Sequence, residues 1–173
     1  DFLINKDHNV SIIDDLSTGN IDNLKHIINS ELLTIKIGSI FNHEILKNEI
    51  KNADLVFHLA AAVGVKNIVK KPLDSIVRNV HGTENVFKLC AKYKRKIYFA
   101  SSSEVYGKQN IVPFDESDDL IIGPPEKLRW SYAASKLIDE FHGLSFYREK
   151  NLPIVIGRQF NTVGPRQSSR YGM

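Results

Sequence analysis

Five short apolar runs rich in β-branched residues alternate with segments of helical spacing along this chain. Apolar residues recur at three- and four-residue steps over residues 76–90 and 137–144, which predicts helices that lie on a sheet. Strands and helices that alternate in this way form a parallel sheet covered on both faces. The sequence therefore predicts a doubly wound α/β fold, whose strands we place at residues 10–14, 32–37, 54–60, 96–101 and 153–158.

The composition is that of one globular domain without a special partner surface. Apolar residues make up 42% of the 173 residues, which is enough for a buried core. The net charge of +3 comes from Lys and Arg spread along the chain, so we expect neither nucleic acid nor a membrane as a partner. No apolar run approaches the ~20 residues that span a bilayer, and residues 1–9 lack a signal-peptide pattern. The single Cys90 excludes an internal disulfide, and we expect a cytoplasmic protein.

The two ends of the chain predict a piece of a longer protein. Residues 1–9 resemble the end of a helix that runs into the first predicted strand, whereas a doubly wound sheet opens with a strand and a glycine-rich turn. The last predicted strand is followed only by residues 159–173, which leave no room for a substrate-covering domain. We therefore expect residues 1–173 to be a partial dinucleotide-binding domain that is inactive and poorly stable by itself.

A long irregular segment, residues 107–127, follows the fourth predicted strand and contains three of the six prolines. Loops of this length in compact domains are usually functional or mobile. Ligands of open α/β sheets bind at the carboxyl ends of the strands. We therefore expect this segment to form the rim of an active site.

Tyr132 and Lys136 form the sharpest local motif. A step of four residues puts both side chains on one face of a predicted helix, one turn apart. A neighbouring ammonium lowers the pKa of a phenol, so Lys136 could make Tyr132 a base near neutral pH. The same spacing also occurs in helices where a tyrosine simply packs under a lysine stem.

A polar cluster supports the catalytic interpretation. Ser101, Ser102, Ser103 and Glu104 directly follow the fourth predicted strand, at the end where ligands bind. Hydroxyl groups there could bind a substrate alcohol or ketone, and a carboxylate could relay a proton. A serine run that only closes the strand and caps the next turn remains the alternative, above all for Ser101.

Asp14 ends the first predicted strand and is followed by Asp15. In dinucleotide-binding folds a carboxylate at the end of the second strand binds the adenosine ribose and disfavours a 2′-phosphate, which argues for NAD over NADP. A turn that ends the strand is compatible with this role. His58 lies within an apolar strand and is interpreted as a core residue. The other histidines have no metal-ligand spacing, so no metal is expected.

Together these motifs resemble the NAD-dependent epimerase/dehydratase family of extended short-chain dehydrogenases/reductases, nearest to nucleotide-sugar epimerases and UDP-glucuronate decarboxylases. The resemblance covers the whole chain, and the order and spacing of the stretches make it specific. The stretches are residues 12–19 (IIDDLSTG), 56–61 (VFHLAA), 79–86 (NVHGTENV), 101–107 (SSSEVYG), 132–136 (YAASK) and 158–166 (RQFNTVGPR).

The resemblance implies roles for individual residues. Tyr132 would be the base, Lys136 would bind the nicotinamide ribose and lower the tyrosine pKa, and Ser102 and Ser103 would hold the reacting sugar hydroxyl beside Glu104. The cofactor residues that it implies are Asp14, Asp15, Ser39, Ile40, Leu59, Ala60, Ala61, Asn79, Ser101, Tyr132 and Lys136, and the substrate residues are Val63, Asn161 and Arg166. The sequence has Gly38-Ser39 where many relatives have Gly-Asp, which puts an aspartate contact to the adenine in doubt.

The resemblance also implies a reaction. NAD would accept a hydride from the sugar C4 of a nucleotide sugar and give a 4-keto intermediate, which then loses carbon dioxide, is reduced on its other face, or loses water. Ser103-Glu104 and residues 123–130 resemble UDP-glucuronate decarboxylases, which we favour slightly over a UDP-glucose 4-epimerase and then a 4,6-dehydratase. A homodimer through helices around residues 83–93 and 131–147 is a further implication. A non-catalytic dinucleotide-binding protein, which would normally have lost Tyr132 or Lys136, is the alternative from another class.

Overall fold

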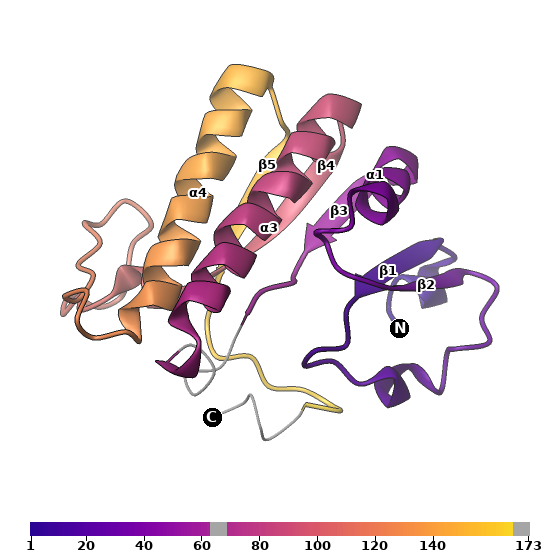
Figure 1. Ribbon diagram of the computed structural model, residues 1–173, viewed down its shortest axis with the longest axis horizontal. Coiled ribbons are helices and arrows are strands. Elements are labelled where there is room, and N and C mark those ends of the chain that lie inside the picture. The colour runs from indigo at the N-terminus through magenta and orange to yellow at the C-terminus, as the bar shows by residue number, and fades with distance from the viewer. Residues whose placement is uncertain (63–68, 168–173) are drawn as a thin grey trace. The chain divides into compact units, whose positions relative to one another are not determined.

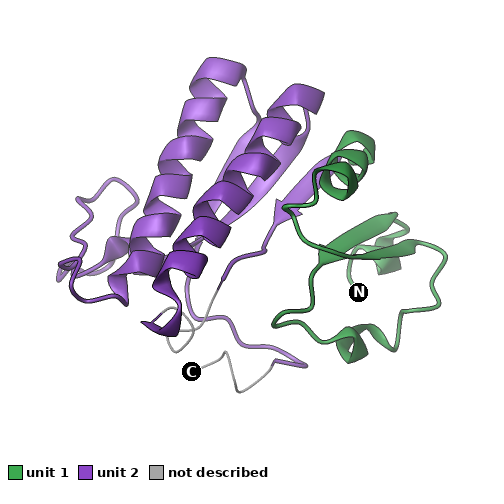
Figure 2. Ribbon diagram, in the orientation of Figure 1, with its two compact units in different colours: residues 1–53 green, residues 54–173 purple. Residues whose placement is uncertain are grey.

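A computed structural model describes residues 1–62 and 69–167 of the chain. The chain divides into two compact units, residues 1–53 and residues 54–173 (Figure 2). Each unit contains its own parallel sheet, and all five predicted strands are present within one or two residues of their expected bounds. The predicted α/β class with parallel strands is confirmed.

The first unit is a two-stranded sheet followed by one helix. The strands run parallel, with Ile12 opposite Ile35. The side chain of Asn42 accepts a hydrogen bond from the backbone N–H of Ile45 at 3.2 Å and caps the helix, which buries Leu46 against the unit. In chain order the elements are η1 (Ile4–Lys6), β1 (Val10–Asp14), η2 (Ile21–Leu24), β2 (Leu33–Ile37) and α1 (His43–Asn52), where η marks a 3-10 helix.

The second unit is a three-stranded parallel sheet in the order β3-β4-β5 with two long helices. The helices α3 and α4 lie side by side along the same face of this sheet (Figure 1). Each ends at a residue in the left-handed conformation, Lys94 after α3 and Asn151 after α4. The elements are β3 (Leu55–His58), α3 (Pro72–Tyr93), β4 (Lys96–Ser102), η3 (Ser103–Tyr106), α4 (Trp130–Lys150) and β5 (Ile154–Gln159).

The core of the second unit lies between α3 and β4. Phe87 meets Phe99 edge to face, with ring centroids 5.5 Å apart, and both side chains are fully buried. Cys90 lies one turn further along α3 and is also fully buried. Burial raises the pKa of its thiol to about 12, so the thiol stays protonated at neutral pH.

The apolar spacing predicted α4 correctly but not the side that packs on the sheet. Phe141 is 61% exposed and Leu144 is 42% exposed, and Ile76 on α3 is 40% exposed. The buried side of α4 instead carries small and ionisable residues, namely Ala133, Ser135, Lys136, Asp139, Glu140 and Gly143. The expectation that the apolar stripe faces the sheet was therefore wrong, because small residues permit a close approach and the ionisable ones have partners there.

The sequence predicted helices on both faces of the sheet, and the second unit differs from this expectation. Within the described part of the second unit, helices cover one face of the sheet, and Leu55, Phe57 and Val155 are 47%, 48% and 63% exposed. Among the described residues, no hydrogen-bonded ladder joins β1-β2 to β3-β4-β5.

None of the helices in residues 1–62 and 69–167 is both long enough and apolar enough to cross a membrane. The expected cytoplasmic location stays a prediction.

The close approach of α4 to β5 at Gly143 gives a stability prediction. A Cβ atom there would lie 2.8 Å from Ile154 Cδ1 and 3.3 Å from Ile156 Cδ1. We expect Gly143→Val to lower the free energy of unfolding by about 1–3 kcal/mol because the valine overpacks this contact. Gly164→Val is the matched control, since a Cβ atom at Gly164 would meet no atom within 4 Å. Urea unfolding curves measure both, and equal effects would contradict the assignment.

Candidate active site

Tyr132, Ser102 and Glu104 meet at the carboxyl end of β4. Tyr132 lies in the first turn of α4 and is hydrogen-bonded to the side chain of Ser102, which is the last residue of β4. The Ser102 hydroxyl also accepts a hydrogen bond from the backbone N–H of Glu104 at 3.2 Å. An oxygen of Glu104 lies 3.8 Å from the guanidinium of Arg129. The structure therefore brings together three residues that the sequence predicted for catalysis.

The surroundings of Tyr132 favour its neutral form. Burial raises the pKa of the phenol to about 12, and the nearby carboxylates of Glu104 and Asp139 raise it as well. The hydrogen bond with Ser102 acts in the opposite direction. In this arrangement the hydroxyl of Tyr132 holds its proton at neutral pH. The expected lowering of this pKa by Lys136 therefore stays a prediction.

Lys136 is almost fully buried one turn after Tyr132. Its side chain is 2% exposed, and its ammonium donates a hydrogen bond to the backbone carbonyl of Ala100 at 2.8 Å. The same Nζ atom lies 4.6 Å from the centre of the Phe99 ring, which attracts a cation. Burial lowers the pKa of Lys136, and the carboxylates of Asp139 and Glu140 raise it. The lysine is thus held against the backbone of the strand that carries Ser102.

Asn79 holds the segment that follows β3. Its side-chain oxygen accepts a hydrogen bond from the backbone N–H of Ala62 at 2.7 Å, and its Nδ2 lies 3.2 Å from the hydroxyl of Ser135 on α4. Asn79 is only 2% exposed. In the segment that ends at Ala62, Leu59 and Ala60 are exposed and Ala61 is half-buried.

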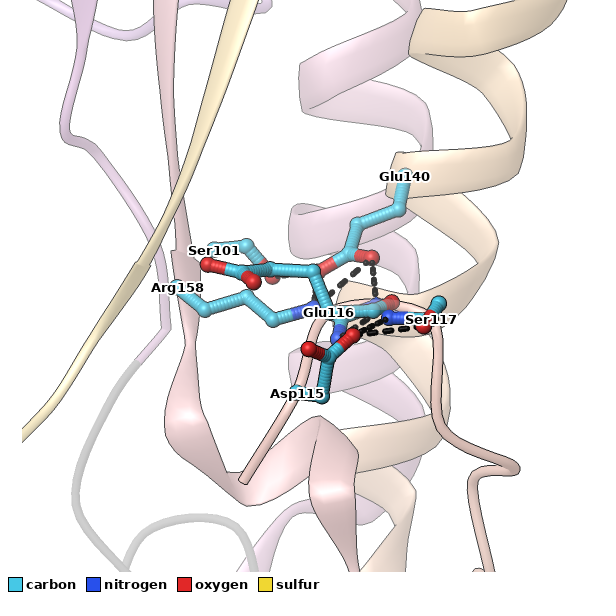
Figure 3. A network of polar contacts seen from close by, with 6 residues as sticks. All are labelled: Ser101, Asp115, Glu116, Ser117, Glu140 and Arg158. Atoms are coloured by element: carbon cyan, nitrogen blue, oxygen red, sulfur yellow. Dashed lines mark hydrogen bonds and ion pairs between the residues drawn. The ribbon is translucent and has the colours of Figure 1, made fainter. Parts of the chain in front are cut away.

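A polar network that the sequence did not reveal anchors the strand ends (Figure 3). Glu140 on α4 accepts a hydrogen bond from Ser101 at 2.5 Å and pairs with Arg158 of β5, whose Nη2 lies 2.9 Å away. Arg158 also donates to the backbone carbonyl of Glu116 at 3.4 Å, which fastens the irregular segment. The guanidinium packs over the ring of Tyr106 at 4.7 Å. The feature of the sequence that could have revealed this network is Glu140, an acidic residue four positions after Lys136 on the predicted helix.

The hydroxyl of Ser101 is engaged in this network and the residue is 4% exposed. Its predicted role in cofactor binding stays a prediction, and the contact with Glu140 gives it a structural role. Ser103 is half-buried in the first turn of η3. Asn161 and Arg166 lie after β5 and are exposed. Val63 lies outside the described residues.

The first unit presents a carboxylate at the end of β1. Asp14 is exposed, and its Oδ1 atom accepts a hydrogen bond from the backbone N–H of Leu16 at 2.7 Å. A side chain at Gly19 would press against this carboxylate, with the Cβ atom 3.0 Å from Oδ1. Glycine therefore leaves room beside the acid. Asp15 accepts a hydrogen bond from Ser17, and Ser39 and Ile40 follow β2, where they are half-buried.

Among residues 1–62 and 69–167, no group of three or more His, Cys, Asp and Glu side chains is placed to hold a metal ion. The residues gathered at the end of β4 carry hydroxyl, phenol, ammonium and carboxylate groups.

Known proteins resemble the chain in sequence and structure. The chain is 38% identical, over 95% of its length, to a UDP-N-acetyl-α-D-glucosaminuronate decarboxylase of Bacillus cytotoxicus. It is 36% identical to a UDP-N-acetylglucosamine 4-epimerase of Methanobrevibacter ruminantium solved with UDP-N-acetylmuramic acid, with a TM-score of 0.89 over its whole length. A dTDP-glucose 4,6-dehydratase of Streptomyces venezuelae solved with NAD is 26% identical over 92% of the chain, with a TM-score of 0.83.

The chain spans about half the length of these proteins, 50%, 54% and 48% respectively. The family model described as GDP-mannose 4,6 dehydratase matches residues 1–172. The resemblance to extended short-chain dehydrogenases/reductases that act on nucleotide sugars is thereby confirmed. The chain belongs to the GDP-mannose 4,6 dehydratase family.

Proposed function

We propose that the protein that carries this chain is an NAD-dependent enzyme that oxidises the C4 hydroxyl of a nucleotide sugar to a ketone. The observation that carries the proposal is the contact between Tyr132 and Ser102, with Lys136 one helical turn further on. This arrangement places a phenol and a hydroxyl together at one strand end, with a lysine near enough in the sequence to make the phenol a proton acceptor.

The residues of the first unit fit the adenosine end of NAD. The exposed carboxylate of Asp14, with Gly19 leaving space beside it, suits the two hydroxyls of a ribose and would repel a 2′-phosphate. The related dehydratase of Streptomyces venezuelae was solved with NAD. NAD would supply the hydride acceptor for the oxidation. In the second unit, Lys136 would hold the nicotinamide ribose and Asn79 would shape the backbone of residues 59–62.

Different residues of the chain would bind the sugar C4 hydroxyl and accept its proton. Ser102 and Tyr132 would bind the C4 hydroxyl between them, and Tyr132 would take its proton. Because the pKa of Tyr132 is raised to about 12, this step needs a positive charge close to the phenol. Lys136 supplies that charge if its ammonium turns from the Ala100 carbonyl towards the site. Ser103 would assist Ser102, and Asn161 and Arg166 would meet the nucleotide phosphates.

Among the possible products, we favour decarboxylation of a UDP-sugar acid. The relative from Bacillus cytotoxicus is a decarboxylase of this kind. Oxidation at C4 makes a C6 carboxylate a β-keto acid, which loses carbon dioxide readily. Glu104, whose carboxylate faces Tyr132 and Arg129, is the residue on which this preference rests. A 4-epimerase is the second candidate, supported by the relative from Methanobrevibacter ruminantium.

A homodimer is the assembly that we propose. The helices α3 and α4 expose apolar side chains on their outer surfaces, which a second copy of the same two helices would cover. These side chains, each at least 39% exposed, are Leu73, Ile76, Val77, Ile138, Phe141, Leu144 and Tyr147.

The first prediction from this function concerns the base. In the full-length protein with NAD, we expect Tyr132→Phe to lower turnover of UDP-glucuronate or UDP-N-acetylglucosaminuronate by about 100-fold or more, because the proton acceptor is lost. Tyr98→Phe is the matched control, since Tyr98 lies in the middle of β4. Product mass spectrometry measures the loss of carbon dioxide, and sugar NMR after incubation with UDP-glucose measures epimerisation, which leaves the mass unchanged. Carbon dioxide loss identifies a decarboxylase, and an epimerised UDP-glucose would identify an epimerase. Unchanged turnover in Tyr132→Phe would contradict the proposal.

The second prediction concerns the cofactor. We expect Asp14→Asn to weaken NAD binding and to reduce the preference for NAD over NADP, because the charge that repels a 2′-phosphate is removed. Asp22→Asn, an acid on the 3-10 helix η2, is the control. Isothermal titration with NAD and NADP gives the two affinities. An unchanged ratio of affinities in Asp14→Asn would rule out this role.

The third prediction concerns assembly. We expect Phe141→Glu to shift the full-length protein from dimer to monomer, because a charge would be buried in the apolar contact. Lys150→Glu, a charge change at the exposed end of the same helix, should leave the mass unchanged. Light scattering after size exclusion measures the mass. A dimer that persists in Phe141→Glu would place the interface elsewhere.

A further inference from the structure

Asp139 is a buried acid on α4 that the proposed reaction does not use. Its exposed fraction is 0%, and its Oδ2 atom accepts a hydrogen bond from the hydroxyl of Thr83 on α3 at 3.2 Å. The other oxygen, Oδ1, is buried and has no hydrogen-bond partner among the described residues. A carboxylate that loses water without full replacement is costly unless a nearby charge compensates it.

Towards the sheet, Asp139 is linked by hydrogen bonds to two neutral side chains, first Thr83 and then His58. The Nε2 atom of His58 lies 3.0 Å from the hydroxyl oxygen of Thr83. Burial and, to a smaller extent, the charge of Lys136 lower the pKa of His58 to about 3, so the imidazole is neutral at physiological pH. Because the Thr83 hydroxyl donates to Asp139, it can accept the Nε2 proton of His58. This chain fixes the carboxyl group but brings it no positive charge.

Lys136 is the cation whose charge acts on Asp139. The two residues are three apart on α4, so their side chains lie on the same side of the helix. Burial raises the pKa of Asp139, and the ammonium of Lys136 and the hydrogen bond from Thr83 lower it. Burial lowers the pKa of Lys136, whereas the negative charge of Asp139 and, to a smaller extent, that of Glu140 raise it. Each of the two groups thus favours the charged form of the other.

Glu140 alone cannot supply the negative charge that keeps Lys136 in its charged form. Its carboxylate already accepts hydrogen bonds from Ser101 and from two nitrogens of Arg158. The charge of Glu140 is therefore largely compensated by the guanidinium. Asp139 has no such cation besides Lys136 among the described residues, and the remaining ionisable neighbour, Tyr132, is neutral at physiological pH.

We propose that Asp139 is a positioning residue that keeps buried Lys136 in its ammonium form and thereby sets the upper pH limit of the reaction. The proposal rests on the function proposed above for Lys136. A neutral lysine would give Tyr132 no positive charge, so turnover is expected to fall as the pH rises through the pKa of Lys136. Removal of the Asp139 charge lowers that pKa, and the alkaline limb of the pH profile moves to lower pH.

The test is a direct titration of Lys136 by NMR in the full-length protein with labelled lysine, with its signal assigned from a Lys136→Met spectrum. We expect Asp139→Asn to lower the pKa of Lys136 by about one unit, because an opposite charge has been removed. Glu149→Gln removes the same charge at an exposed position of α4 and should leave the Lys136 pKa unchanged. An equal pKa in Asp139→Asn and the wild-type protein would overturn the proposal.

Two further measurements keep the test decisive if Asp139→Asn does not fold. In the first, the carboxyl carbon of Asp139 is titrated by NMR in the wild-type protein and in Lys136→Met. The pKa of Asp139 should rise in Lys136→Met because the neighbouring positive charge is gone. An unchanged pKa would refute the pairing of the two residues. Asp139→Glu, which restores the charge, should also restore the wild-type alkaline limb of turnover. A lowered Lys136 pKa without turnover of any nucleotide sugar would leave the pairing intact and refute the proposed function.

Discussion

Three ionisable side chains are buried on the inner side of α4, and each has its partner on a different element. Lys136 bonds to the backbone of β4, Asp139 to Thr83 of α3, and Glu140 to Arg158 of β5. A buried charge that loses its partner costs several kcal/mol. Rotating or sliding α4 would break at least one of these contacts. The second unit therefore has one favourable position for this helix, and the apolar contacts of α3 and β4 pack around it.

That position determines the geometry of the candidate site. Tyr132 lies one turn before Lys136, so the contact of Lys136 with Ala100 brings the phenol to Ser102, two residues further along β4. The bond from Ser101 to Glu140 holds the same strand end from the other side. Catalytic groups on a strand and a helix are held more precisely than groups on loops, provided that their own contacts are fixed. Here the fixing contacts are polar and buried.

The fold could be predicted from local patterns because each strand and helix has its own spacing of apolar residues. The meeting of Tyr132, Ser102 and Glu104 could also be predicted, since strand ends gather ligands and the motifs were specific. Asp139 was missed because a spacing rule for apolar residues does not detect a buried charged face. Its partner, Thr83, is 56 residues away in the sequence, so only the packing of α3 on α4 joins them. The same rule assigned Phe141 to the wrong side of α4.

The burial of Cys90 has a practical consequence. It is the only cysteine of the chain and lies fully buried on α3 against the core. A thiol with a pKa near 12 reacts slowly, and an alkylating reagent can reach it only when α3 separates from the sheet. The labelling rate of this one sulfur atom therefore reports how often the second unit opens. A bound molecule that holds α3 and β4 together would slow the labelling, which makes the native thiol a built-in probe for ligands that need no assay of turnover.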